Sequence, residues 1–144
     1  AESGASLDEV EALARHRSER TRLFGALDTL DNLKKGGRIG NAKALLATAL
    51  AIKPIIEVVD GTVEQGGKQR TRSKALKFLA SKVEEYQGRI NDLAVLHADC
   101  ADVDEFVAMV RPFHDGEIVV GQIGPVVGTH TGRGTIGIAF DITD

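Results

Sequence analysis

The chain has 144 residues, of which 42% are hydrophobic and 27% are charged, with a net charge of -3. These values are near the averages for globular proteins and exclude a disordered, collagen-like or disulfide-stapled chain. A chain of this length buries about 70% of its unfolded surface in one core, so a single domain over residues 1–144 is expected. The lone Cys100 fits a reducing cytoplasm. The polar residues 1–4 and the lack of a long apolar run predict neither a signal peptide nor a transmembrane segment.

The charge is distributed unevenly along the chain. Residues 1–90 carry 16 of the 18 Lys and Arg residues against 12 acidic residues, whereas residues 91–144 carry 2 against 9. The segment 34–77 holds ten basic and three acidic residues and would attract a phosphate or an acidic partner. The overall isoelectric point of about 5.8 and the absence of Trp argue against nucleic acid as that partner.

Local signals predict the elements of the first half. Ser6 and Glu9 have the spacing of a capping box, and apolar residues recur with helical period after them. Pro54 disfavours the helical conformation in the residue before it, so the apolar helix that precedes it ends near Lys53. Asp60-Gly61 predicts a type I′ hairpin turn. The expected elements are a helix over 6–20, a strand over 21–27, a short helix ending at 36–37, a helix over 42–52, and strands over 54–59 and 62–65.

The second half alternates helical and extended patterns. The pattern predicts helices over 72–86 and 102–111 and strands over 90–97, 117–121 and 135–142. Strand–helix–strand units are too few for a doubly wound sheet. The expected fold is α+β: a two-layer sandwich with a mixed, mostly antiparallel sheet and helices on one face.

Seven of the sixteen glycines fall within residues 116–137. Gly132, Gly134 and Gly137 match a dinucleotide-binding fingerprint, but only seven residues follow, too few for the required helix and acidic residue. A Gly-Lys-Ser/Thr phosphate loop is absent from the sequence. Neither nucleotide motif therefore explains the glycines.

The segment 123–132 places His130 between Thr129 and Thr131 on a predicted glycine-hinged loop. An imidazole, two hydroxyls and exposed amides suit a carboxylate or a phosphate. The alternative is a tight loop in which His130 hydrogen-bonds backbone only.

Two basic segments, 34–39 and 68–72, place Arg side chains beside helix ends, where they either bind an oxyanion or form a solvated face. The segment 97–100 contains a His and the only Cys, which is too few ligands for a metal, and a turn at a strand end is expected there. No nucleophile–base pair or metal set can be assembled, so we expect neither an enzyme nor a cofactor.

Four ordered blocks resemble the second half of DegV-family proteins, the fatty-acid-binding subunits of a two-component fatty acid kinase. The blocks are residues 27–30 with 35–39 (Leu-Asp-Thr-Leu and Lys-Gly-Gly-Arg-Ile), 52–58 with 60–61, 67–72 (Gly-Lys-Gln-Arg-Thr-Arg), and 123–132 with 134 (Ile-Gly-Pro-Val-Val-Gly-Thr-His-Thr-Gly). The resemblance spans about residues 7–140. It implies that the chain is a C-terminal lipid-binding domain whose N-terminal partner domain is absent from this sequence.

The resemblance also implies a function and a site. A long-chain fatty acid would be bound with its carboxylate at His130 and Arg38, beside Thr129 and Thr131, and would be phosphorylated by a separate kinase subunit for phospholipid synthesis. The family's partner-facing arginine corresponds to Arg70 or Arg72. The residues expected to dock the kinase are Lys68, Arg70, Arg72 and Lys74. The residues expected to form the acyl-chain wall are Ile39, Leu45, Leu46, Leu50, Ile52, Ile55 and Val126. A large exposed apolar face is expected around five of them, Leu45, Leu46, Leu50, Ile52 and Ile55.

The rival hypothesis is a non-enzymatic interaction or regulatory module whose basic face binds nucleic acid or an acidic protein. Copurified lipid would favour the first hypothesis, and a salt-dependent shift of DNA in a gel would favour the second.

Overall fold

A six-stranded sheet organises the chain in the computed structural model, which describes residues 4–47 and 51–143. The strand order is β3-β2-β1-β6-β4-β5. Only β4 and β5 pair in parallel, and the other neighbouring pairs are antiparallel. The predicted α+β fold with a mixed, mostly antiparallel sheet is confirmed. The strands are β1 (Thr21–Ala26), β2 (Lys53–Val59), β3 (Thr62–Gln69), β4 (Ile90–His97), β5 (Ile118–Gln122) and β6 (Ile136–Ile142).

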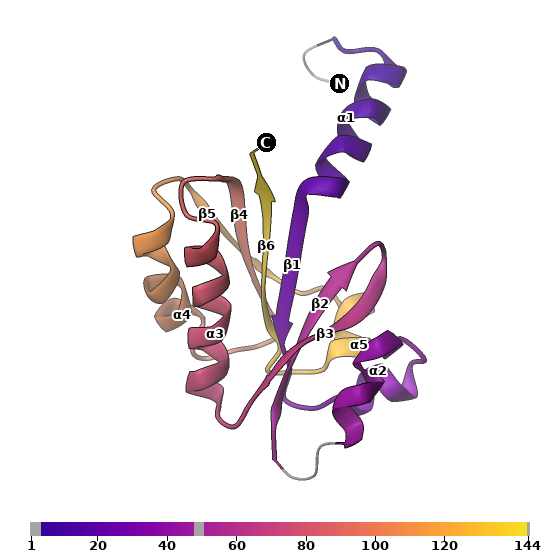
Figure 1. Cartoon of the computed structure of the whole chain (residues 1–144), viewed down its shortest axis with the longest axis vertical. Helices are drawn as coiled ribbons and strands as arrows, with labels where there is room; N and C mark the ends of the chain where they lie inside the picture. The colour runs from indigo at the N-terminus through magenta and orange to yellow at the C-terminus, as the bar shows by residue number, and fades with distance from the viewer. Residues whose placement is uncertain (1–3, 48–50, 144) are drawn as a thin grey trace.

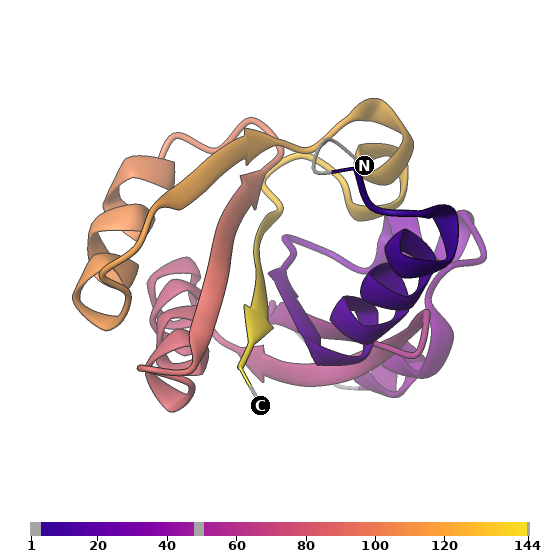
Figure 2. The same ribbon diagram turned by 90° about the horizontal axis from the view of Figure 1, so that it is seen from above.

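The helices are arranged on both sides of this sheet. Figures 1 and 2 show α3 and α4 side by side against one face, with α2 and α5 on the other side and α1 projecting from the end of β1. The helices are α1 (Leu7–Arg20), α2 (Asp31–Lys35), the 3₁₀ helix η1 (Gly40–Ala47), α3 (Arg72–Glu85), α4 (Val103–Val110), the 3₁₀ turn η2 (Arg111–Phe113) and α5 (Pro125–Thr131). In the described part of the chain, no helix is long and apolar enough to span a bilayer.

The main core lies between the sheet and the pair α3 and α4. Phe140 in β6 stacks with Phe24 of β1 at 6.4 Å between ring centroids and meets Tyr86 at 5.3 Å. Leu79 of α3 and Phe106 of α4 are fully buried against these strands. Because each large buried side chain contributes about 1.5–3 kcal/mol relative to exposure, this cluster dominates the stability of the domain.

A smaller second core lies on the opposite face of the sheet. Ile55 and Ile56 are consecutive in β2, so their side chains point to opposite faces. Ile55 belongs to the main core and Ile56 to the second. The helices were expected on one face of the sheet. In the structure α3 and α4 cover one face, and α2 and η1 cover the second core on the opposite face. Its buried members are Leu27, Leu30, Leu33, Ala42, Leu45 and Ile56.

Two local predictions are confirmed. Ser6 caps α1, with its backbone N–H 2.7 Å from Glu9 Oε2, as a capping box requires. Asp60 and Gly61 have φ angles of 49° and 74° and join β2 to β3, as the Asp-Gly signal predicted.

The apolar helix expected over residues 42–52 is wrong in type and length. The chain forms η1, which ends by Ala47, and residues 48–50 lie outside the described part. Ile52 lies before β2 and packs on the second core. Gly40 explains part of the departure: its φ is 51° and a Cβ there would overlap the carbonyl oxygen of Val63. This close approach to β3 fixes the start of η1.

Candidate functional site

The segment that carries His130 is a helix, α5, where the sequence predicted a loop. Pro125 occupies the first turn and Gly132, with φ 85°, ends the helix. Proline at the start and glycine just past the end are helix-boundary signals that could have revealed it. No residue of α5 is buried. No side chain of α5 therefore packs in either core, and the position of the helix depends on contacts at its ends and with α2.

His130 lies against Gly36, the residue that ends α2. A Cβ built on Gly36 would overlap Nδ1 of the imidazole and stand 2.7 Å from Cε1. The Nδ1 atom is buried and has no hydrogen-bond partner among the described residues. A buried ring nitrogen without a partner is costly. The His130 ring is thus packed closely against Gly36, and its Nδ1 atom makes no hydrogen bond with the described residues.

Arg38 contacts the backbone of the same glycine. Its side chain is exposed, and one terminal nitrogen donates to the carbonyl oxygen of Gly36 at 3.2 Å. The predicted pair, Arg38 and His130, therefore meets at Gly36. A guanidinium with four free N–H groups beside a partly buried imidazole forms a cationic, hydrogen-bonding end to the site.

The two threonines beside His130 use their hydroxyl protons within α5. Thr129 Oγ1 donates to the carbonyl oxygen of Pro125 at 2.7 Å, and Thr131 Oγ1 donates to that of Val127 at 3.3 Å. In this arrangement each hydroxyl offers lone pairs, and a carboxylate would have to displace an internal hydrogen bond to reach the proton.

Two more glycines bring α5 close to α2. A Cβ on Gly132 would overlap the side-chain amide of Asn32, and one on Gly134 would overlap the carboxylate of Asp28. Asp28 in turn accepts a hydrogen bond from Lys53 Nζ at 2.7 Å. Three close approaches thus align the segment 28–36 with the segment 130–134, and they account for two of the seven glycines in residues 116–137, Gly132 and Gly134.

A cavity of about 260 Å³ opens next to Asp28, and neither His130 nor Arg38 lines it. It lies between the segment 28–31 and the residues around the end of η1. Leu45, Leu46 and Ile52, which were predicted as acyl-chain wall, line it, and Asp28, Thr29 and Asp31 form its polar side. The cavity therefore combines an apolar wall with a polar rim, as ligand pockets do.

The other predicted wall residues lie elsewhere. The structure corrects the assignment of Ile55 to the acyl-chain wall. Ile55 is fully buried in the main core, and Ile56 is the β2 residue that faces the second core. Ile39 packs on the second core, Val126 lies on α5 with 78% of its surface exposed, and Leu50 lies outside the described residues. The continuous exposed patch that was expected is wrong, because Leu45 is only 4% exposed and Leu46 is the half-exposed member.

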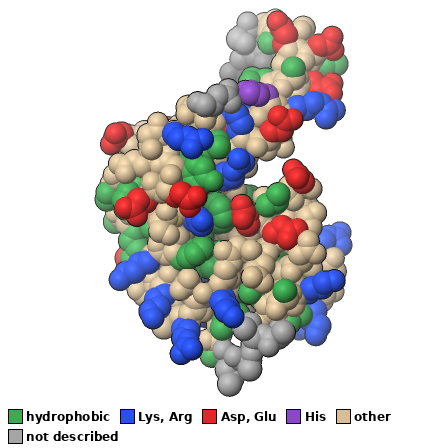
Figure 3. Space-filling view, viewed as in Figure 1, with side chains coloured by type: hydrophobic (Ala, Val, Ile, Leu, Met, Phe, Trp, Pro, Cys, Tyr) green, Lys and Arg blue, Asp and Glu red, His purple; other side chains and the backbone are tan. Residues whose placement is uncertain are grey.

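The basic residues expected to dock a kinase divide into two groups. Lys68, Arg70 and Lys74 are exposed around the junction of β3 and α3. Figure 3 shows Lys and Arg side chains gathered over the lower part of this face, with acidic side chains above them. The structure corrects the assignment of Arg72 to the docking surface, because its guanidinium is bound to Asp102 and is not free to face a partner.

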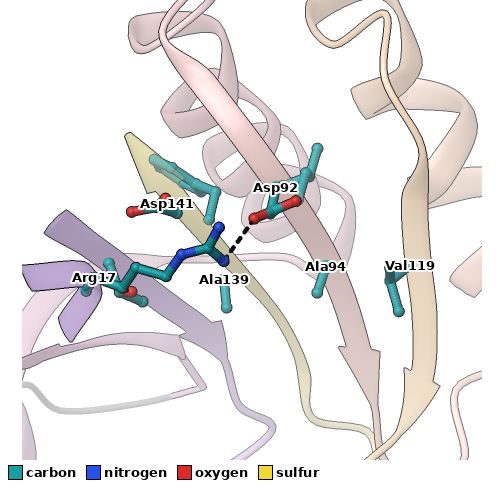
Figure 4. A pocket seen from close by; sticks show the side chains of 9 residues that line it. Arg17, Asp92, Ala94, Val119, Ala139 and Asp141 are labelled. Carbon is teal, nitrogen blue, oxygen red and sulfur yellow. Dashed lines mark hydrogen bonds and ion pairs between the residues drawn. The ribbon is translucent and has the colours of Figure 1, made fainter. Parts of the chain in front are cut away.

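A second cavity, of about 290 Å³, lies at the other end of the sheet and was not predicted. Its floor contains the small side chains Ala94 and Ala139, and Arg17 of α1 reaches across it to Asp92 at 3.0 Å (Figure 4). Both charged side chains are more than half exposed. Such a pair contributes little to stability.

The His97–Cys100 segment forms the expected turn. The backbone N–H of Cys100 donates to Nδ1 of His97 at 3.2 Å. Within residues 4–47 and 51–143, no group of three or more His, Cys, Asp or Glu side chains is placed to hold a metal ion.

Comparisons with known proteins fit this fold. A family model described as "Uncharacterised protein, DegV family" matches residues 1–143. A DegV domain-containing protein of Streptomyces coelicolor is 37% identical over 144 residues, which cover 96% of this chain and 50% of that protein. The chain belongs to the DegV family, and it spans about half the length of the curated relatives that it matches.

Solved structures show the same likeness. A fatty-acid-binding DegV family protein from Thermus thermophilus superposes with a TM-score of 0.88 at 30% identity, over 99% of this chain and 52% of that one. A DegV family protein from Eubacterium eligens, loaded with heptadecanoic acid, has a TM-score of 0.82 at 26% identity, over 99% of this chain and 52% of that one. A Streptococcus pneumoniae fatty acid kinase B3 protein, loaded with linoleic acid, shares the fold at 19% identity and a TM-score of 0.83, over 98% of this chain and 51% of that one.

Proposed function

We propose that this chain is the C-terminal half of a cytoplasmic protein that binds a long-chain fatty acid and presents its carboxylate to a fatty acid kinase. The observation that carries the proposal is the pair His130 and Arg38, which both contact Gly36. Because Nδ1 of His130 is packed against Gly36, the other ring nitrogen, Nε2, is the one that would bind a ligand. Relatives with this fold are described with bound fatty acids, so a carboxylate suits these donors.

The carboxylate would accept hydrogen bonds from Nε2 of His130 and from N–H groups of Arg38. Charge-assisted hydrogen bonds of this kind are roughly twice as strong as neutral ones. Thr129 and Thr131 would complete the polar end by rotation of their hydroxyls. The missing N-terminal domain would close the site and supply further hydrogen bonds to the carboxylate.

The acyl chain would lie along the second core. Leu45, Leu46 and Ile52 form the apolar wall of the cavity beside η1, and Ile39 packs on the same core. A cavity of about 260 Å³ is smaller than the roughly 300–1,000 Å³ of typical ligand sites, so a long chain would also need cover from the partner domain.

The chain would act as a carrier and the kinase would supply the catalytic groups. Lys68, Arg70 and Lys74 form an exposed basic rim that would attract the acidic surface of the kinase. Rim charges mainly raise the rate of association. The phosphoryl group would be transferred from ATP to the bound carboxylate, giving an acyl phosphate and ADP.

The test is lipid extraction from the purified full-length protein, with its N-terminal domain, followed by mass spectrometry, in parallel for the wild type and His130→Ala. Fatty acid recovered from the wild type in near-stoichiometric amount, and reduced in the folded variant, would support the proposal. An empty wild-type protein that takes up no added oleic acid, or one that shifts DNA in a salt-dependent manner, would contradict it.

A further inference from the structure

Arg72 joins three segments that are far apart in the sequence. It lies at the start of α3, directly after the capping residue Thr71. Its Nε and one terminal nitrogen bind the two carboxylate oxygens of Asp102 at 2.8 and 2.9 Å. A second terminal nitrogen donates to the carbonyl oxygen of Gly134 at 2.5 Å, and the first also contacts Cys100 Sγ at 3.3 Å. The guanidinium thus connects α3, the loop before α4 and the turn that follows α5.

The turn held by Arg72 joins the C-terminal end of α5 to β6, whereas residues 123–124 join its N-terminal end to β5. Gly134 N–H donates to the carbonyl oxygen of Ala98 at 2.8 Å, and Ala98 N–H donates to that of Thr135 at 2.8 Å. The buried Thr135 hydroxyl donates to the carbonyl oxygen of Thr131, the last residue of α5, at 3.0 Å. A chain of hydrogen bonds therefore runs from Arg72 through the turn 132–135 to the residue next to His130.

This chain of bonds matters because α5 buries none of its own residues. A helix without buried side chains takes its position from its ends and from its neighbour α2. Asp102 fixes the orientation of the guanidinium, and the hydrogen bond from Arg72 lowers the pKa of Asp102 and keeps it ionised. Only the planar fork of an arginine can bind a carboxylate with two nitrogens and a carbonyl with a third.

We propose that Arg72, oriented by Asp102, is a positioning residue that fixes the turn 132–135 and thereby holds the His130 imidazole over Gly36. This role deepens the proposed function, because it concerns the same site. It also separates Arg72 from Arg70: Arg72 works inside the domain, and Arg70 remains on the surface.

The test compares the wild type with Arg72→Lys and Asp102→Asn. Arg15→Lys is the matched control, since Arg15 also binds a carboxylate with two nitrogens, that of Glu11 on the exposed face of α1. Two measurements need no ligand: hydrogen exchange of the α5 amides, and the NMR resonances of the His130 ring. A third is the affinity for oleic acid.

Both variants should fold, with α5 amides that exchange about tenfold faster and a His130 ring resonance that moves, while α4 and β6 keep their protection. The control should change neither. Oleic acid affinity should fall about tenfold in the two variants, because the imidazole is no longer held in place.

Unchanged α5 exchange and an unchanged His130 resonance in either folded variant would overturn the positioning role. Uniform loss of protection throughout the domain, or failure of both variants to fold, would also overturn it, since the pair would then be a general structural ion pair. A wild type that binds no oleic acid would contradict the proposed function alone, because exchange and resonances report on the positioning without ligand.

Discussion

The imidazole of His130 rests on Gly36 so closely that no Cβ fits between them. Gly36 has φ -81° and ψ -1°, an ordinary right-handed conformation that any residue adopts. Glycine is therefore needed here for space and not for backbone freedom. The neighbouring Gly37 has the opposite requirement, with φ 66° and no atom within 4 Å of a built Cβ. Glycine is thus required at position 36 because a side chain would overlap His130, and at position 37 because the backbone has a positive φ angle.

Gly36→Ala should displace His130. Overpacking of this kind costs about 1–3 kcal/mol of unfolding free energy, and oleic acid affinity should fall with it. In the His130→Ala background the same change should cost almost nothing, because the ring is gone. Urea unfolding of the wild type, both single variants and the double variant measures this coupling.

Gly37→Ala is the control for that cycle. A residue with a Cβ in the left-handed region costs about 1–2 kcal/mol, with or without His130. Equal costs for Gly36→Ala in both backgrounds would show that His130 does not occupy the space above Gly36.

His130→Ala should weaken fatty acid binding more than it weakens the fold. Loss of a hydrogen bond to a charged group costs about 1.5–3 kcal/mol, so the Kd for oleic acid should rise roughly ten- to a hundredfold. Removal of an unpartnered buried nitrogen should leave the melting temperature nearly unchanged. Calorimetric titration and thermal unfolding measure the two effects, and early melting with normal affinity would assign His130 a purely structural role.

Local signals allowed most of the fold to be predicted. The capping box at Ser6 and the Asp-Gly turn are encoded within a few residues, so they identified α1 and the β2–β3 hairpin directly. The helix α5 escaped because Gly128 and β-branched residues such as Val126 and Thr129 disfavour helix formation. Its boundaries come from Pro125 and Gly132, and its position comes from distant contacts.

Other parts of the site depend on geometry that one sequence does not contain. Ile55 and Ile56 are both apolar, so alternation along β2 could not tell which of them faces α3. Arg72 finds its partners 30 and 62 residues away, at Asp102 and Gly134. A run of basic residues therefore looked uniform in the sequence, although one of its members lies inside the domain.

The Arg72–Asp102 pair should make stability depend on pH at the acid end. The hydrogen bond from Arg72 is the main cause that lowers the pKa of Asp102 below its usual 3.8, against the opposing effect of partial burial. Above pH 3.8 the pair contributes fully. As the pH falls further, the unfolded chain binds the proton first, and the contribution is lost as the pH passes the lowered pKa of the folded state.

The measurable quantity is the difference in unfolding free energy between the wild type and Asp102→Asn. We expect about 2 kcal/mol in favour of the wild type between pH 5 and 7, and a difference that shrinks steadily below pH 3.8. Subtraction of the variant removes the contribution of the other carboxylates. A difference that stays constant down to pH 2.5 would contradict the pairing of Asp102 with Arg72 in solution.

Charge reversal on the basic rim should slow phosphorylation without emptying the site. Lys68→Glu and Arg70→Glu replace exposed cations that do not line the cavity of about 260 Å³, so bound fatty acid should remain at the wild-type level. The rate of acyl phosphate formation at low kinase concentration should fall about tenfold at low salt, because complementary charges accelerate encounter. The deficit should diminish above about 0.5 M salt, where screening shortens the reach of these charges to a few ångströms.

Arg15→Glu on α1 is the matched control, and fatty acid bound to it should be phosphorylated at the wild-type rate. Loss of lipid occupancy in Arg70→Glu would instead place Arg70 in the binding site, and an unchanged rate at low salt would remove the rim from the docking surface.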